Sequence, residues 1–193
     1  MDVRDNAAVK MPATNASITA VCLNPKHGFS KQPQPSIRLL AGLGVEGDAH
    51  CGATVQHLYL KRKNPHAPNR MQVHLIQQEL FDDLHALGHE VQPGELGENI
   101  TTSGIDLLTL PTGTRLHLGE DAVVELTGLR TPCKQIDGFQ PGLMKRLVLK
   151  GKEQPVPARA GVMSVVLHGG IVCAGDAIVI ERPAEPWQPL RFI

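Results

Sequence analysis

The chain has 193 residues, with 19 basic and 19 acidic side chains and a formal net charge of zero at neutral pH. This length suits one domain with at most a small appendage, and it can form a hydrophobic core without disulfides or a structural metal. The balanced charge creates no overall field that would attract nucleic acid or an anionic membrane, and the 3% of aromatic residues is too low for a base-stacking surface. We therefore expect neither nucleic acid nor a membrane as a partner.

The two ends of the chain differ in composition from the middle. Residues 1–16 mix polar residues with alanine and a proline, which predicts a disordered tail without the apolar core of a secretory signal. Residues 183–193 contain three prolines and the only tryptophan, and they predict an extended strap over the body of the protein. Residues 17–182 are expected to form a single domain. The four cysteines contain no Cys-x-x-Cys pair, which is typical of reduced thiols in a cytoplasmic protein.

Three apolar segments in the first half of the chain predict regular structure. Ser17–Leu23 is apolar and β-branched, as strands are, and a loop with three prolines separates it from a short strand at Ile37–Leu40. Gln72–Ile76 predicts a further strand. It continues into Gln77–Leu87, whose apolar side chains fall on one face of an amphipathic helix, and Gly88 is suited to end that helix.

The second half of the chain contains more predicted strands than helices. Thr114–Leu118 and Ala122–Thr127 are joined by Gly119–Asp121, which predicts the tight turn of a hairpin. Other segments predict a short helix at 142–149, a buried strand at 161–167, and short apolar segments at 107–110, 171–173 and 177–181. Numerous short strands with glycine turns and at most two helices indicate a mainly β fold of the α+β or barrel-like type, not a parallel βαβ sheet.

Two glycine-rich segments predict backbone that turns sharply or approaches another group closely. Gly42–Gly52 is not a phosphate loop, because no Gly-Lys-Ser/Thr follows, and His50 within it is either a pocket residue or part of a surface loop. Pro93–Gly104 holds Glu98 and Asn99 between a glycine and an isoleucine. Asn99 can contact a ligand, or it can serve as a cap or turn residue.

The basic segment 55–69 is interrupted by prolines, which argue against a continuous helix, and we interpret it as a solvated surface loop. Its histidines also allow an alternative interpretation as a zinc site. The candidate ligands would be His50, Cys51, His57, His66 and His74. Their spacings match no standard zinc finger or ribbon, so this alternative has little support.

Cys133 is the residue with the most reactive surroundings in the sequence. It follows an apolar strand and a proline, and Arg130 and Lys134 can stabilise its thiolate. Pro132 suits the first turn of a short helix, whose amides favour negative charge. No His–Asp companion follows from spacing, so a cysteine hydrolase is unsupported. A soft thiolate suits a metal centre or a transferred sulfur atom. Arg130 and Arg70 can hold the anionic tail of a cofactor. The alternative is that Cys133 is a buried structural cysteine.

Several motifs together resemble the MOSC family, which is found at the C-terminus of molybdenum cofactor sulfurases and in stand-alone bacterial proteins. They include the Arg-x-Pro-Cys motif at Arg130–Cys133, and they follow one another in the order of the family over about residues 18 to 190. The segments that carry the resemblance are Gly44–Gly52, Arg70–Ile76, Gly94–Thr102, Leu129–Cys133, Gly161–Met163, Gly169–Val172 and Gly175–Asp176.

The resemblance implies a distorted antiparallel β-barrel that binds the molybdenum cofactor, molybdopterin, with Cys133 as molybdenum ligand or sulfur carrier. It implies cofactor contacts from Arg130, Thr131, Asn99, Glu98, His50, Asp48, Arg70 and Gln72. Some relatives reduce N-hydroxylated small molecules with electrons from a separate protein. Pyridoxal phosphate belongs to the desulfurase domain of the larger sulfurases and is not expected here.

Two departures from the family pattern affect this expectation. Cys51 stands where relatives often have a small residue, and the segment 54–69 is longer than in the shortest members. Three hypotheses remain open at this point. The protein is a molybdenum enzyme acting on an N–O bond, a sulfur carrier served by a cysteine desulfurase, or a binding module in which Cys133 is structural.

Overall fold

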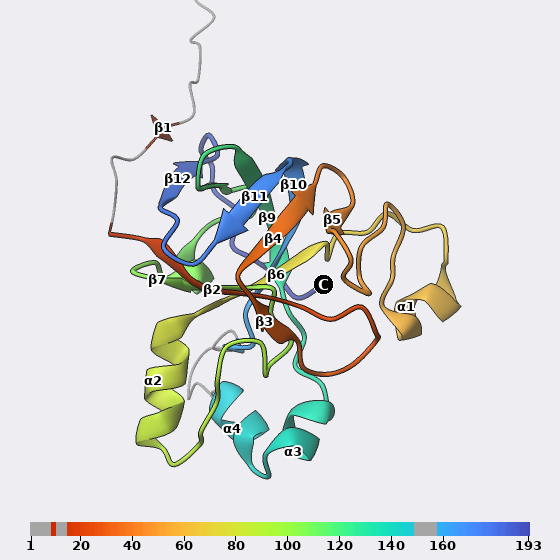
Figure 1. Cartoon of the computed structure of the whole chain (residues 1–193), viewed down its shortest axis with the longest axis vertical. Helices are drawn as coiled ribbons and strands as arrows, with labels where there is room; N and C mark the ends of the chain where they lie inside the picture. The colour runs from red at the N-terminus through yellow and green to blue at the C-terminus, as the bar shows by residue number, and fades with distance from the viewer. Residues whose placement is uncertain (1–8, 11–14, 149–157) are drawn as a thin grey trace, which may run out of the picture.

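The computed structural model describes residues 9–10, 15–148 and 158–193, and most of the predicted disordered tail lies outside them. Within these ranges, twelve strands form two sheets. Figure 1 shows how they are arranged. The strands are β1 Val9–Lys10, β2 Ser17–Leu23, β3 Gln32–Gln34, β4 Ser36–Leu40, β5 Gly44–Val45, β6 Val73–Gln77, β7 Ile100–Ser103, β8 Arg115–Leu118, β9 Ala122–Leu129, β10 Val162–His168, β11 Gly170–Cys173 and β12 Ile178–Arg182. The helices are α1 Leu58–Lys63, α2 Gln78–Ala86, the 3₁₀ helix η1 Leu107–Thr109, α3 Gln135–Phe139 and α4 Leu143–Leu147.

The larger sheet has nine strands in the order β1-β12-β8-β9-β10-β6-β7-β2-β3, and the smaller has the order β11-β4-β5. The prediction of a mainly β fold with few helices is confirmed. The expected antiparallel barrel is wrong, because the described strands form open, mixed sheets. Helix α2 crosses from β6 to β7, which makes that pair parallel, with Leu75 opposite Ile100. An isolated bridge between Ser17 and Ala177 brings the start of β2 near β12 without closing a ring.

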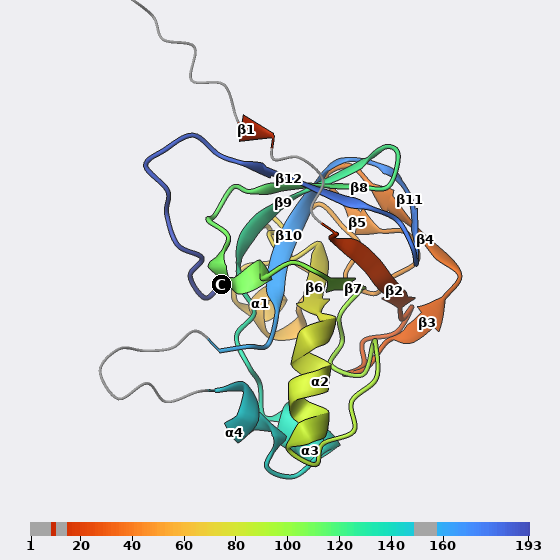
Figure 2. The same cartoon turned by 90° about the vertical axis from the view of Figure 1, so that its left-hand side faces the viewer.

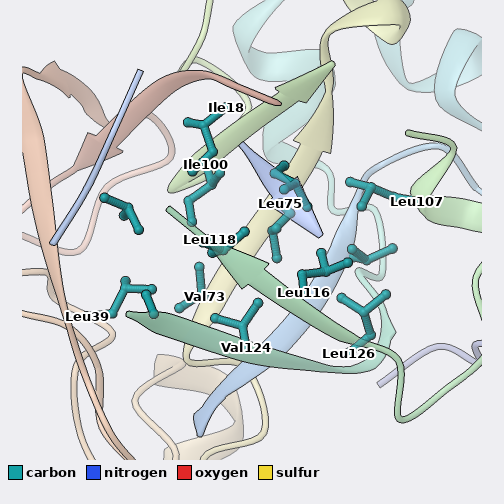
Figure 3. Packing of buried hydrophobic residues seen from close by; sticks show 14 of the residues in the cluster. Ile18, Leu39, Val73, Leu75, Ile100, Leu107, Leu116, Leu118, Val124 and Leu126 are labelled. Carbon is teal, nitrogen blue, oxygen red and sulfur yellow. The ribbon is translucent and has the colours of Figure 1, made fainter. Parts of the chain in front are cut away.

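The main core lies between the two sheets, because alternate side chains of their strands point to one face. Along β8, Leu116 and Leu118 are buried while Arg115 is exposed. Figure 3 shows how these leucines pack with Leu75 from β6, and Leu39 reaches the same cluster from the small sheet. Burying side chains of this size stabilises the fold by about 1.5–3 kcal/mol each.

A second core cluster lies under the helices. In both Figure 1 and Figure 2, α2, α3 and α4 gather at the end of the molecule away from most strands. Buried Leu84 of α2, Ile136 of α3 and Leu147 of α4 belong to this cluster. It anchors α3, and so it fixes the segment that carries Cys133 directly before that helix. No helix among the described ranges is long and apolar enough to cross a membrane.

Most predicted elements are present, but several short ones were missed. The 3₁₀ helix η1 forms where an apolar segment was expected to run straight, since Asp106 Oδ1 accepts a hydrogen bond of 3.2 Å from the Leu108 amide and starts a turn. Helices α1 and α3 and strand β3 have too few residues for a periodic pattern. The hairpin of β8 and β9 is confirmed, with Leu118 opposite Ala122.

Residues 183–193 follow the surface from β12 to the end of β9. The Thr112 amide donates a hydrogen bond of 2.8 Å to Gln188 O, and the Leu129 amide donates one of 2.8 Å to Arg191 O. Figure 2 shows this segment leaving β12 at the upper left, turning down and ending where the C-terminus is marked. This segment is called the strap below.

Candidate functional site

A cavity of about 450 Å³ lies among segments that are far apart in the sequence. Its wall combines the loop after β2, helix α1, strands β6 and β10, the glycine-rich turn before β7, the segment after β9, and the end of the strap. The lining residues are Gly28, Phe29, Lys31, His50, His57, Tyr59, Leu60, Asn69, Met71, His74, Gly97, Asn99, Arg130, Thr131, Pro132, Cys133, Gln135, Met163 and Ile193. This volume falls in the range of small-molecule sites.

Cys133 is half-buried in this wall, and its thiol lies 3.5 Å from Gln135 Oε1. Its carbonyl accepts a hydrogen bond of 3.1 Å from the Ile136 amide, which fixes the backbone at the start of α3. The helix begins at Gln135, so Pro132 precedes it and does not occupy its first turn. The thiol is therefore held by local backbone structure and faces the cavity.

Arg130 lines the cavity together with Cys133 and interacts with it electrostatically. Its amide donates a hydrogen bond of 3.0 Å to Gly161 O, and its guanidinium carbon lies 5.8 Å from the centre of the Phe29 ring. Burial lowers the pKa of Arg130, while its electrostatic interactions with Cys133 and Glu98 act in the opposite direction. Its buried Nη1 has no hydrogen-bond partner among the described residues. A buried donor without a partner is costly, and an anion in the cavity would satisfy it.

Asp48 lies behind the cavity and organises three residues that line it. Its Oδ2 accepts hydrogen bonds from Lys31 Nζ, from Asn99 Nδ2 at 3.2 Å and from the Asn24 amide at 3.1 Å. Its Oδ1 accepts one of 2.9 Å from the His50 amide and lies 3.3 Å from that imidazole. Burial alone would raise the pKa of this carboxyl, but the hydrogen bonds from His50 and the charge of Lys31 outweigh it and hold the pKa well below its usual range.

Sequence reasoning missed Lys31, and it considered His74 only as a ligand in the zinc alternative. Lys31 is buried beside Asp48, and burial lowers its pKa although the carboxylate opposes the shift. His74 is buried in β6, where burial and the charge of Arg130 lower its pKa to about 3. Its Nε2 lies 2.9 Å from Ala160 O, so the neutral ring donates there. Nothing in the sequence marks Lys31, because only the fold brings its loop to Asp48.

The predicted site residues divide into two groups. Cys133, Arg130, Thr131, Asn99 and His50 all line the cavity. The other four, Glu98, Asp48, Arg70 and Gln72, do not line it.

Those four residues have their contacts within the protein. Glu98 is fully buried, and its Oε1 accepts a hydrogen bond of 2.5 Å from the Gly94 amide. Burial raises the pKa of Glu98, with its hydrogen bonds acting the other way. The Arg70 guanidinium donates to Thr127 O at 3.3 Å. Gln72 Nε2 donates to Gly42 O at 2.8 Å, so this side chain braces the glycine-rich loop.

The basic segment 55–69 is mostly exposed, as predicted, but it is not solely a surface loop. Helix α1 buries none of its residues, yet Tyr59 and Leu60 line the cavity together with His57 just before it. Across the ranges that the structure covers, no group of three or more His, Cys, Asp or Glu side chains is arranged to hold a metal ion.

The arrangement matches a known family. The model of the MOSC domain matches residues 62–179, which is more than half of the chain. The chain belongs to the MOSC domain family. The matched range contains Cys133, Arg130 and most of the sheet that positions them.

The chain of this MOSC protein is also similar to a curated protein and to solved structures. A protein named "Reductase" from Gibberella moniliformis is 29% identical over 169 residues, which cover 83% of this chain but only 27% of that relative. The crystal structure of the YuaD protein from Bacillus subtilis has a TM-score of 0.72 at 20% identity, and the match covers 92% of this chain and 100% of the YuaD chain. The crystal structure of YiiM from Escherichia coli has a TM-score of 0.58 at 16% identity, and the match covers 89% of this chain and 72% of the YiiM chain. At these identities the solved structures show the fold alone.

Proposed function

We propose that this MOSC protein binds the molybdenum cofactor in the cavity beside Cys133 and reduces an N–O bond in a small molecule. MOSC domains are associated with binding of this cofactor in general, and one relative is named a reductase. The observation that carries the proposal is that one cavity joins the Cys133 thiol to Arg130, whose buried Nη1 has no partner among the described residues. The soft Cys133 thiolate suits the metal of the cofactor, and the Arg130 cation suits its anionic tail.

The cavity residues would divide the binding of this cofactor between them. Cys133 would ligate the metal as a thiolate, and Arg130 would neutralise the anionic tail. Lys31 adds a second cation, and Asn99 adds an amide; Asp48 holds both side chains. When bound, the cofactor would supply a metal centre that exchanges two electrons with the substrate.

His50 is suited to move a proton in this reaction. Reduction of N–OH to N–H consumes two electrons and two protons and releases water, and the electrons come from a separate electron-transfer protein. Asp48 Oδ1 lies 3.3 Å from His50 Nδ1, which orients the imidazole and leaves Nε2 available to a ligand. His50 would protonate the departing oxygen.

Metal analysis tests the proposal. Protein purified from a host that makes the cofactor should contain about one molybdenum per chain, and Cys133→Ala should lose most of it because the thiolate ligand is gone. Cys173→Ala is the matched control, since Cys173 is partly exposed and lies outside the cavity lining. Equal molybdenum in the Cys133→Ala and wild-type proteins would falsify the ligand role.

A sulfur carrier is the second candidate, because the only side chain within hydrogen-bond distance of the Cys133 thiol is Gln135, so among the described residues the sulfur is open to a donor. In this case a cysteine desulfurase transfers one sulfur atom to the thiolate to form a persulfide. Intact mass after the reaction should show one added sulfur on wild-type protein and none on Cys133→Ala. An adduct placed on Cys51 by peptide mapping counts against this role.

A further inference from the structure

The proposed function leaves the apolar part of the cavity without a role. Met71, Met163 and Ile193 line the cavity together with the charged residues. We propose that these side chains form a subsite for the uncharged aliphatic or aromatic body of a small-molecule ligand, and that Ile193 sets its depth. The inference rests on the proposed function only for the chemistry at Cys133.

Strand register explains how this subsite forms. In β10, Met163 is paired with His74 of β6 on one side and with Gly128 of β9 on the other. Directly paired residues project to the same face of a sheet. The three paired residues form a row across the sheet, from His74 through Met163 to Gly128. His74 and Met163 both line the cavity. Because Gly128 has no side chain, the position beside Met163 at that end of the row is left open.

Ile193 fills this space. The Ile193 amide donates a hydrogen bond of 3.2 Å to Leu129 O, and the Leu129 amide donates one of 2.8 Å to Arg191 O, so the strap runs beside β9. A Cβ atom placed on Gly128 would lie 2.7 Å from Ile193 Cγ2 and 2.6 Å from Arg191 O. Glycine is thus required for the strap to dock, and docking places Ile193 over the row. Leu190, which is 8% exposed, anchors the segment in the core.

The two sides of the cavity determine the chemical class of the ligand. Arg130 repels a cation and attracts an anionic group, whereas the charge of Lys31 is balanced by Asp48. An ionised group at Met163 and Ile193 would lose hydration without finding a partner, which is costly. The cavity of about 450 Å³ suits a small molecule. The body of the ligand beside Ile193 is therefore compact, uncharged and apolar.

Alkylation of Cys133 with maleimides of different size tests the subsite without requiring the cofactor or turnover. N-methylmaleimide and N-cyclohexylmaleimide serve as the small and large probes, and N-(2-carboxyethyl)maleimide as a large charged probe. Peptide mass spectrometry measures the rate at Cys133 separately from the other thiols. The variants are Ile193→Ala, which deepens the subsite, and Ile193→Phe, which fills it. Phe192→Ala is the matched control, because Phe192 is the adjacent strap residue, 51% exposed and outside the cavity lining.

Ile193→Ala should raise the cyclohexyl-to-methyl rate ratio by about tenfold, since one methylene in an apolar pocket changes selectivity by roughly 10-fold or more. Ile193→Phe should lower the ratio, and Phe192→Ala should leave it unchanged. The ratio of the charged probe to N-methylmaleimide should not rise in Ile193→Ala, because its carboxylate is drawn to Arg130.

Two results would overturn the inference. A cyclohexyl-to-methyl ratio that stays within about twofold of wild type in both Ile193 variants shows that Ile193 does not set the depth. An equal rise for the charged and apolar probes in Ile193→Ala shows a wider opening without apolar preference. Molybdenum content tests the proposed function separately, so protein without molybdenum can still show the predicted size selectivity.

Discussion

The polar and apolar walls of the cavity are built in opposite ways. The polar wall depends on Asp48, a buried carboxylate whose oxygens accept hydrogen bonds from Lys31, Asn99 and His50. The apolar wall combines Met163 of β10 and Ile193 of the strap with Tyr59, which comes from a helix with no buried residue. The first wall is therefore part of the folded core, whereas the Tyr59 part of the second can change with little effect on folding. Cofactor binding would be tied to stability, and ligand selectivity would not.

Asp48→Ala should produce the largest effect, because it removes the acceptor at the centre of the polar wall. Lys31 would remain buried without its partner, and breaking a buried ion pair costs about 3–5 kcal/mol. We expect the free energy of unfolding to fall by about that amount in urea denaturation. Asp121→Ala, at an exposed turn, should change it by less than about 0.5 kcal/mol.

The pH dependence of the same variant sharpens the test. The folded pKa of Asp48 lies below its unfolded value, so its contribution is present above about pH 4 and is lost as the pH falls below that value. Wild-type protein should lose more stability than Asp48→Ala between about pH 4 and pH 2. Parallel acid-unfolding curves for the two proteins would show that Asp48 is not the centre of the polar wall.

Local chemistry made part of the site predictable from the sequence. Arg130 and Cys133 are neighbours in the chain, so their pairing needs no knowledge of the fold. The β8–β9 hairpin is likewise encoded by a turn at Gly119–Asp121 between two apolar segments. His50 and Asn99 lie in glycine-rich segments whose composition already indicated an unusual backbone.

The rest of the site could not be predicted from the sequence, because it depends on pairing between distant segments. Lys31 and His74 reach the cavity because β2, β6 and β10 bring distant segments together. Lys31 lies in no distinctive local pattern, and the segment around His74 did not indicate that its side chain lines the cavity. The parallel pairing of β6 and β7 is set by the path of α2, and it makes the predicted antiparallel barrel impossible at that pair. Asp48 and Gln72 were assigned to cofactor binding by family pattern, yet their polar atoms contact the protein itself.

Glu98→Gln tests whether the buried Glu98 carboxyl group, which does not line the cavity, binds a proton in the folded protein. Burial raises the folded pKa of Glu98, so the folded state holds this proton more tightly than the unfolded state. Stability should therefore decline as the pH rises from about 4.3 through the raised pKa. The variant lacks the titrating group and should not show this part of the decline in urea denaturation. Glu120→Gln, at an exposed turn, should follow wild type; a Glu98→Gln curve that also follows wild type rules out the buried proton.

Tyr59→Ala should have the smallest effect on stability, although Tyr59 lines the cavity. Its side chain is 57% exposed, and its cation–π contact with Lys63, at 4.6 Å, is worth no more than about 1 kcal/mol at the surface. Removing the ring should open the apolar wall and increase the rate at which N-methylmaleimide alkylates Cys133. Leu58→Ala is the matched control, because Leu58 lies on the same helix, is 50% exposed and does not line the cavity. A loss above about 2 kcal/mol would mean that both walls belong to the folding core. Equal alkylation rates in the two variants would mean that Tyr59 does not limit access to Cys133.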